Sequence, residues 1–167
     1  MNESSADCSQ KFRKAKKLTE SFLSDVWTRS KHPRHMADVN GDGKDDIVGF
    51  ANSGVYVALW EGNTFSEATR WTTSFASNIW QVAKHPRYLA DVNGDGKDDV
   101  VGFANSGVYV SLSDGETFPE ATRWTTSYGA NVWSRYKHPR MMSDVNGDGK
   151  DDIVGFANSG VYVSFSQ

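Results

Sequence analysis

The chain contains the string Asp-Val-Asn-Gly-Asp-Gly-Lys-Asp-Asp three times, beginning at Asp38, Asp91 and Asp144. The copies follow one another at intervals of 53 residues. Three tryptophans keep the same interval: Trp27, Trp80 and Trp133. Self-similarity at a fixed period of this length is the signature of a repeat architecture. The sequence therefore predicts three consecutive copies of one structural unit.

Each copy shows the alternation of apolar and polar residues that is typical of short strands. In the second copy, the expected strands cover residues 88–92, 100–104, 108–112 and 118–125. Four antiparallel strands in a repeat of this length favour a β-propeller blade, and a solenoid of small sheets is the weaker alternative. We therefore expect an all-β protein with repeats at approximately residues 12–64, 65–117 and 118–167, preceded by a flexible segment at residues 1–11.

The phase of the repeat leaves one blade incomplete. The chain starts near Phe12 with residues of a fourth strand and ends near Phe165, after a third strand. Three blades cannot close a ring, because propellers typically have four to eight. We expect the N-terminal strand of one copy to complete the last blade of another, so that a homodimer forms a six-bladed ring. A fragment of a longer, seven-bladed gene is the alternative explanation.

The acidic string offers oxygen ligands at alternate positions and a backbone carbonyl at its seventh position. Hard cations such as Ca²⁺ bind several oxygens at about 2.3–2.6 Å. An EF-hand is excluded, because Gly49 occupies the twelfth position, where an EF-hand has Glu. The alternative is a turn closed by Asp and Asn side chains without metal. The expected calcium ligands, with the carbonyl of the lysine in each set, are Asp38, Asn40, Asp42, Lys44 and Asp46; Asp91, Asn93, Asp95, Lys97 and Asp99; and Asp144, Asn146, Asp148, Lys150 and Asp152.

The composition limits the function classes. The formal net charge of −3 argues against nucleic acid as a partner. Cys8 is the only cysteine, so an intrachain disulfide and a cysteine-based zinc site are excluded. The sequence contains neither the run of about 20 apolar residues that spans a bilayer nor a recognisable signal peptide. We expect a soluble protein without membrane insertion, and its compartment stays undetermined.

A carbohydrate site is expected on the face opposite the acidic loops. The Asn-Ser-Gly turns and the stretch at residues 126–139 share that face, because they connect the other ends of the strands. A sugar pocket needs an aromatic surface and a few convergent polar groups. The candidates are the tryptophans for stacking, the histidines and arginines as donors, and asparagines from a neighbouring blade: Trp27, His32, Arg34 and Asn52; Trp80, His85, Arg87 and Asn105; and Trp133, His138, Arg140 and Asn158.

Each of these residue types also has a structural interpretation. The tryptophans can fill space between blades. The arginines can donate hydrogen bonds to carbonyls of a turn, and the asparagines can serve the backbone of their turn.

Residues 84–91 (Lys-His-Pro-Arg-Tyr-Leu-Ala-Asp), followed by the acidic loop and Val-Gly-Phe at residues 101–103, resemble the blade of the integrin-like seven-bladed β-propeller lectins. This is the family of the Psathyrella velutina lectin and the Photorhabdus lectins. The resemblance recurs in all three copies and covers the chain from about Phe12 onward. It implies sugar binding, of the N-acetylglucosamine or fucose type, in pockets between blades, with calcium in some loops. The chain departs from the family in having three blades, and the near-identity of its copies is typical of recent duplication or of an engineered sequence.

The expected function is that of a multivalent lectin that binds glycans. Three copies of every polar group argue against a single asymmetric active site, so we expect no enzyme activity. A glycosidase needs two carboxylates across a cleft, and the concentrated carboxylates here are expected to hold calcium. Repetition instead favours avidity for a surface with many sugars. A calcium-stabilised protein-binding scaffold is the alternative, because fold alone does not fix function.

Overall fold

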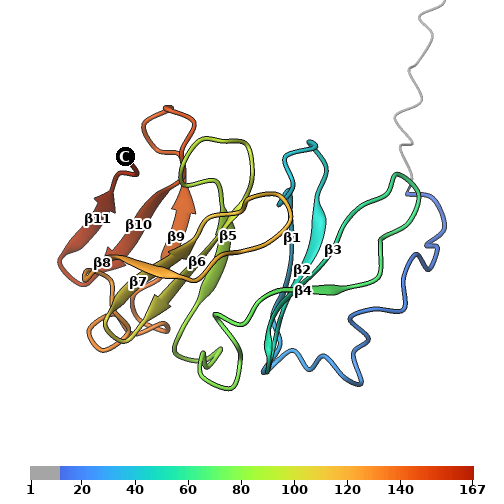
Figure 1. Ribbon diagram of the computed structural model, residues 1–167. Coiled ribbons are helices and arrows are strands. Elements are labelled where there is room, and N and C mark those ends of the chain that lie inside the picture. The colour runs from blue at the N-terminus through green and yellow to red at the C-terminus, as the bar shows by residue number, and fades with distance from the viewer. Residues whose placement is uncertain (1–11) are drawn as a thin grey trace, which may run out of the picture.

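The computed structural model describes residues 12–167 (Figure 1). Within this range the chain forms eleven strands and no helix, so the predicted all-β class is confirmed. The described residues contain no helix long and apolar enough to cross a membrane. The segment predicted to be flexible, residues 1–11, lies outside the described residues.

The strands form three antiparallel sheets, which we call blades 1, 2 and 3. Blade 1 contains β1 (Arg34–Ala37), β2 (Asp46–Ala51), β3 (Gly54–Ala58) and β4 (Thr69–Thr72). Blade 2 contains β5 (Arg87–Ala90), β6 (Asp99–Ala104), β7 (Gly107–Ser111) and β8 (Thr122–Thr125). Blade 3 contains only β9 (Arg140–Ser143), β10 (Asp152–Ala157) and β11 (Gly160–Ser164). In each blade the strands are neighbours in chain order, and their antiparallel pairing confirms the predicted β-propeller blades.

The fourth strand of blade 2 is shorter than predicted, because Phe118 lies before it rather than within it. Asp114 accepts hydrogen bonds from the backbone N–H groups of Glu116 and Thr117, at 2.9 and 2.6 Å, and so holds a turn. Phe118 is buried and packs on Trp71 of blade 1, with ring centroids 5.2 Å apart. Insertion of this ring between two blades takes the place of strand pairing at that position.

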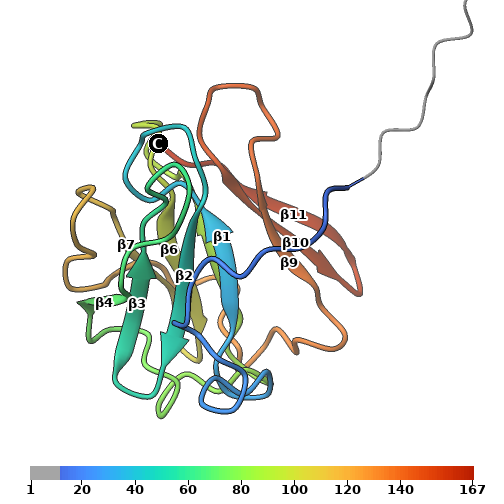
Figure 2. The ribbon, with the colours of Figure 1, turned by 90° about the vertical axis from the view of Figure 1, so that its right-hand side faces the viewer.

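Neighbouring blades pack face to face through apolar side chains. One core cluster joins Val48 and Phe50 of blade 1 to Val100 of blade 2, and a second joins Phe103 of blade 2 to Ile153 of blade 3. Figures 1 and 2 show the three sheets side by side, and most of their strands run from one face of the molecule to the other.

The acidic loops of neighbouring blades are joined by backbone hydrogen bonds. The N–H of Asp98 donates to the carbonyl of Asp38, and the N–H of Asp151 donates to the carbonyl of Asp91, both at 2.7 Å. These loops lie at the top in Figure 1, and the Asn-Ser-Gly turns and the linkers between blades lie at the bottom. The predicted separation of the two faces is therefore correct.

Candidate functional site

Trp80 lies in a pocket on the face of the linkers. It shares a cavity of about 260 Å³ with His85, Asn105, Ser106 and Tyr109. The Trp80 ring meets His85 and Tyr109 edge to face, with centroids 5.8 and 6.2 Å apart. The structure thus brings together the tryptophan, histidine and asparagine that the sequence singled out in this repeat. All three come from the second repeat, since its linker supplies Trp80 and His85 and its β6–β7 turn supplies Asn105.

The same aromatic arrangement recurs in the other two repeats. Trp27 contacts His32 and Tyr56, and Trp133 contacts His138 and Tyr162. In blade 3 the cavity widens to about 650 Å³, because it runs on to the open edge of β11. Asn158 is exposed in the turn that corresponds to that of Asn105.

Gly102 allows Trp80 to lie against the sheet. A Cβ atom at this position would be 2.6 Å from Cζ3 of Trp80 and 2.7 Å from Cε1 of Phe75. Gly49 and Gly155 make the same close approaches in the other blades. The tryptophan therefore packs on the sheet of its own blade and also lines a pocket.

Phe75 adopts a left-handed backbone conformation, with φ of 57°, which is uncommon for a residue other than glycine. Its carbonyl accepts a hydrogen bond from Nη1 of Arg87 at 2.9 Å. Phe22 and Tyr128 have the same conformation at the equivalent positions, with φ of 60° and 58°. Strain of this kind persists where the surroundings over-determine it and is typical of functional sites.

His85 is held as a neutral hydrogen-bond donor. The backbone N–H of Gln81 donates to its Nδ1 at 3.2 Å, so the ring proton resides on Nε2 and is donated to Oδ1 of Asn105 at 3.0 Å. Burial lowers the pKa of His85, and the nearby charges of Lys84 and Arg87 lower it further. His32 has the same partners in the first repeat, the N–H of Thr28 and Oδ1 of Asn52.

The arginines lie below the tryptophan pockets, between blades. Arg87 is 4% exposed, and its guanidinium carbon lies 4.9 Å from the centroid of the Phe50 ring in blade 1. Its bond to the Phe75 carbonyl matches the structural interpretation that the sequence left open. Burial lowers its pKa to about 10, so it remains protonated at neutral pH. Arg140 is buried in the same way against Phe103, and Arg34, in blade 1, is exposed and donates to the carbonyl of Phe22.

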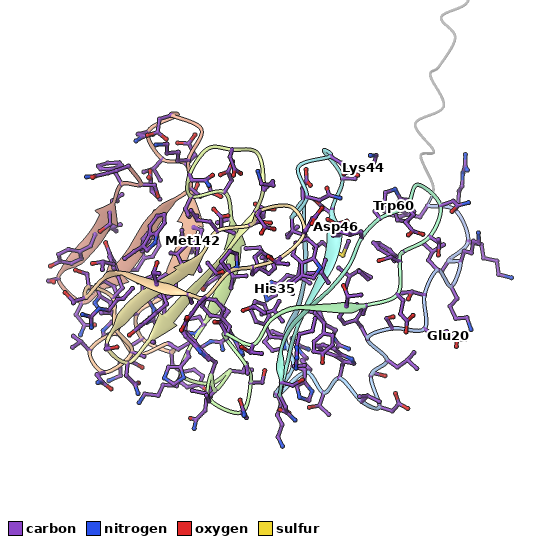
Figure 3. All side chains as sticks on the ribbon, viewed as in Figure 1. Glu20, His35, Lys44, Asp46, Trp60 and Met142 are labelled. Atoms are coloured by element: carbon purple, nitrogen blue, oxygen red, sulfur yellow. The ribbon has the colours of Figure 1, made fainter. Side chains whose placement is uncertain are left out.

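Two nitrogens of each buried arginine lack a hydrogen-bond acceptor among the described residues. Nε and Nη2 of Arg87 have no hydrogen-bond partner among the described residues, and the same is true of Arg140. Arg87 lines a cavity of about 120 Å³ between blades 1 and 2, together with His35, His85 and Arg135. Figure 3 shows His35 between these two blades.

Asn52 lines a further pocket, between blades 1 and 2. This pocket, of about 540 Å³, combines Asn52 and Lys31 from the first repeat with Ser77, Asn78 and Gln81 from the linker into blade 2. Sequence reasoning missed the linker residues, because they are not kept in all three repeats.

A set of exposed aliphatic residues next to the tryptophans was also missed. Ile79 is 71% exposed and lines the Trp80 pocket. Val132 lines the corresponding pocket of blade 3, and Val26 is exposed at the equivalent position of the first repeat. The signal was present in the sequence, since the three positions keep the 53-residue interval.

Hydrogen bonds from backbone N–H groups shape the acidic loops. Asp38 accepts from the N–H groups of Gly41, Asp42 and Gly43, and Asn40 accepts from that of Asp42. Asp46 is fully buried at the start of β2 and accepts from the N–H of Trp60 at 2.7 Å (Figure 3). The other two loops repeat this pattern.

The loop residues fit a hard cation by donor chemistry. No three His, Cys, Asp or Glu side chains in residues 12–167 gather into a metal-binding group. However, an ionised carboxylate has about four lone-pair sites, so its bonds to N–H groups leave capacity for a cation. Burial, together with the charges of Asp95 and Asp91, raises the pKa of Asp99 to about 7. A bound cation would offset this repulsion between the carboxylates of one loop.

Residues 38–84 and 91–155 match the family model of the FG-GAP-like repeat. The chain belongs to the FG-GAP-like repeat family. The first range contains one acidic loop and the second contains two, and the Trp80 pocket lies on the opposite face of the molecule.

The solved structures that resemble this FG-GAP-like chain include two from different organisms. The first is a lectin from Agrocybe aegerita, described by its specific recognition of non-reducing terminal N-acetylglucosamine; it is 40% identical with a TM-score of 0.86. The match covers 91% of this chain and 39% of the lectin chain. The second is the Tc holotoxin pore of Photorhabdus luminescens, 18% identical with a TM-score of 0.61, over 81% of this chain and 6% of that chain, and this likeness concerns the fold alone. Among curated proteins, no sequence matches the chain.

Proposed function

We propose that this FG-GAP-like chain is a lectin that binds non-reducing terminal N-acetylglucosamine through the pockets on its linker face. The observation that carries the proposal is the likeness to the Agrocybe aegerita lectin, at 40% identity over 91% of the chain. A fucose-type sugar is the second ligand to test. We propose binding rather than catalysis, because the polar groups recur in every repeat.

The Trp80 pocket supplies the groups that a sugar needs. The indole face offers a surface for the C–H groups of the sugar ring, and Asn105 and Ser106 offer donors and acceptors for its hydroxyls. Ile79 provides an aliphatic wall that suits the methyl of an N-acetyl group. Arg87, whose Nε and Nη2 have no hydrogen-bond partner among the described residues, lines the adjoining cavity, which shares His85 with this pocket.

The direct test is a glycan array followed by titration calorimetry with N-acetylglucosamine, glucose and fucose. We expect binding of N-acetylglucosamine, and weaker binding of glucose, which lacks the acetamide. A folded protein that binds no sugar on the array would overturn the proposal. That result would favour the protein-binding scaffold, for which the exposed Val26, Ile79 and Val132 offer apolar contacts.

We also propose that the acidic loops bind calcium. The ligands would be the side chains of Asp38, Asn40, Asp42 and Asp46 with the carbonyl of Lys44, and the equivalent residues of the other two loops. The ion would supply positive charge that ties the first strand of each blade to the second. Because the loops lie on the face opposite the tryptophans, calcium would stabilise the fold without touching the sugar.

Multivalency follows from the repetition of the pocket. Several weak sites on one rigid body bind a surface of many sugars through effective concentration. Association of two chains would double the number of pockets on one particle.

A further inference from the structure

Blade 3 has an open edge where blades 1 and 2 have their fourth strand. Val55 in β3 and Val108 in β7 are 0% exposed, whereas Val161, at the same position of β11, is 59% exposed. The described residues contain no strand paired to the outer side of β11. An open edge of this kind presents unpaired backbone N–H and C=O groups and is a template for another strand.

A cavity of about 460 Å³ lies beside this edge, between blades 2 and 3. It is lined mainly by Val101, Val108, Trp124, Ile153 and Phe165. The first four positions recur 53 residues earlier, at the interface between blades 1 and 2, and there they enclose a phenylalanine. The equivalents are Val48, Val55, Trp71 and Val100, which form one buried cluster with Phe118.

The cavity therefore has the lining of a phenylalanine pocket, at the point where the repeat would place its next phenylalanine. Phe118 reaches its pocket from the segment that leads into β8. Residues 118–125 read Phe-Pro-Glu-Ala-Thr-Arg-Trp-Thr, and residues 65–72 read Phe-Ser-Glu-Ala-Thr-Arg-Trp-Thr before and within β4. The occupant should be a segment of this pattern.

The chain contains a third segment of this pattern that its own blades do not use. Residues 12–19 read Phe-Arg-Lys-Ala-Lys-Lys-Leu-Thr, in register with the other two. They form no strand, and the Phe12 side chain is fully exposed. The carbonyl of Leu18 accepts a hydrogen bond from Oγ1 of Thr64 at 2.6 Å, which holds the segment beside blade 1. In Figure 1 blade 1 and β11 lie at opposite ends of the row of blades, so the segment is far from the open edge of its own chain.

We propose that residues 12–19 of a second copy form the fourth strand of blade 3, with Phe12 in the cavity between blades 2 and 3. The pairs Tyr56–Arg70 and Tyr109–Arg123 set the register and place Lys17 of the second copy opposite Tyr162. Two copies that exchange this strand in both directions have six blades. A total of six blades lies within the usual range of four to eight for a closed propeller.

The acidic loops provide a second set of contacts for the same closure. Loops of adjacent blades are joined by the bonds from Asp98 to Asp38 and from Asp151 to Asp91. Asp45, in blade 1, and Asp144, in blade 3, are the equivalent groups at the two ends of the row, and both are exposed. Closure joins the N–H of Asp45 in one copy to the carbonyl of Asp144 in the other.

A disulfide tests the register directly. In a Cys8→Ser background, Lys17→Cys and Tyr162→Cys place two thiols on directly opposite residues, whose Cα atoms are about 4.5–5.5 Å apart in an antiparallel pair and so within disulfide reach. We expect rapid oxidation to a dimer with two bonds, each joining different chains. The matched control pairs Lys17→Cys with Tyr109→Cys, where β8 already occupies the partner position. Cross-linking within one chain, or equal cross-linking in the control, would overturn the proposal.

Light scattering tests the role of Phe12. We expect the wild-type protein to have twice the mass of the 18.5 kDa chain. Phe12→Ala should weaken dimerisation at least tenfold, and Arg13→Ala, a neighbouring exposed residue, should change it little. A monomeric wild type, or a Phe12→Ala dimer as tight as the wild type, would contradict the inference. Because residues 12–19 add no strand to their own blade, far-UV circular dichroism should show the variant folded.

Discussion

The residues around the Trp80 pocket form two groups. One group supports the indole from below, and the other lines the rim, where a ligand would bind. Gly102, Phe75 and Arg87 are buried or in close contact beneath the indole, whereas Ile79 and Asn105 are exposed at the rim. Substitutions below the indole should therefore change the stability of the fold, and those at the rim should change affinity.

Ile79 offers a test of ligand contact without a cost in stability. Changing Val26, Ile79 and Val132 together to Ser should weaken N-acetylglucosamine binding about five- to tenfold, because a few apolar contacts contribute about 1 kcal/mol at each site. The thermal midpoint should stay within about 2 °C, since the side chains are exposed. Calorimetry is the measurement, and Leu112→Ser, an exposed residue at the acidic-loop end of β7, is the control. Equal losses for N-acetylglucosamine and glucose would argue against contact with the acetamide.

His85 should make stability depend on pH. Its folded-state pKa is lowered by burial, so below its ordinary value of 6.5 the unfolded chain binds the proton more readily than the folded chain. The stability that neutral His85 contributes is therefore fully present above pH 6.5 and is lost as the pH falls. The difference in thermal midpoint between the wild type and His85→Gln should shrink between pH 8 and pH 5.5. A difference that stays constant over this range would show that His85 ionises equally in both states.

Gly102→Ala tests the close packing of the indole. The added methyl would meet both the Trp80 and Phe75 rings at less than 3 Å, so we expect a loss of about 1–3 kcal/mol in the free energy of unfolding. Urea denaturation measures this loss. Adding Phe75→Leu should recover part of it, since one of the two clashing rings is removed. An unchanged unfolding midpoint in Gly102→Ala would mean that the rings move aside freely.

At the scale of elements, the acidic loop is a tight connection whose own hydrogen bonds already define its shape. Removing calcium should lower the thermal midpoint rather than unfold the loops one by one. An ion at 100 times its Kd contributes about 2.7 kcal/mol per site, and for a chain of this size each kcal/mol corresponds to about 2–4 °C. Scanning calorimetry with calcium and with a chelator is the measurement.

Loop variants separate calcium binding from turn stability. Asp42→Asn, Asp95→Asn and Asp148→Asn together should abolish the calcium-dependent rise in the midpoint, while Asp114→Asn, in a turn outside the loops, should keep it. Sugar affinity should change less than twofold on chelation, because the loops lie on the far face. If calcium does not change the thermal unfolding midpoint of the wild type, the loops are turns that bind no metal.

The strands of each blade were predictable because their signals are local. Alternating apolar residues and the Asn-Ser-Gly turn at Asn105 set β6 and β7 to within two residues. Phe118 was assigned to a strand because the sequence does not distinguish an apolar residue just before a strand from one within it. The position of its ring is set by contact with the neighbouring blade. The buried position of Arg87 was likewise set by Phe50, which lies in another blade and is distant in the sequence.

At the scale of the whole molecule, the sequence predicted the incomplete third blade from the phase of the repeat alone. It did not reveal the cavity beside β11 or the fact that Phe118 fills the equivalent one, since both depend on how blades pack. The 53-residue spacing of Val26, Ile79 and Val132 is present in the sequence. Spacing alone, however, does not tell whether a side chain faces a core or solvent.

The number of sugar pockets in one assembly should control the strength of binding to a sugar-coated surface. Binding to a surface coated with N-acetylglucosamine should exceed binding to the free sugar by 10² or more, through effective concentration. Phe12→Ala should lose most of this gain while keeping its affinity for the free sugar. Surface plasmon resonance at several coating densities is the measurement. An avidity gain equal in Phe12→Ala and the wild type would show that one chain supplies all the valency.

The hydrogen bonds between neighbouring acidic loops couple the unfolding of each blade to that of its neighbours. Blade 2 is the only described blade with a blade on both sides, and the other two each lack one interface. In a row of units coupled to their nearest neighbours, opening begins at the ends and the centre opens last. Amide hydrogens of β6 should therefore exchange most slowly in the single chain, and joining the ends of the row should make the three blades exchange at similar rates.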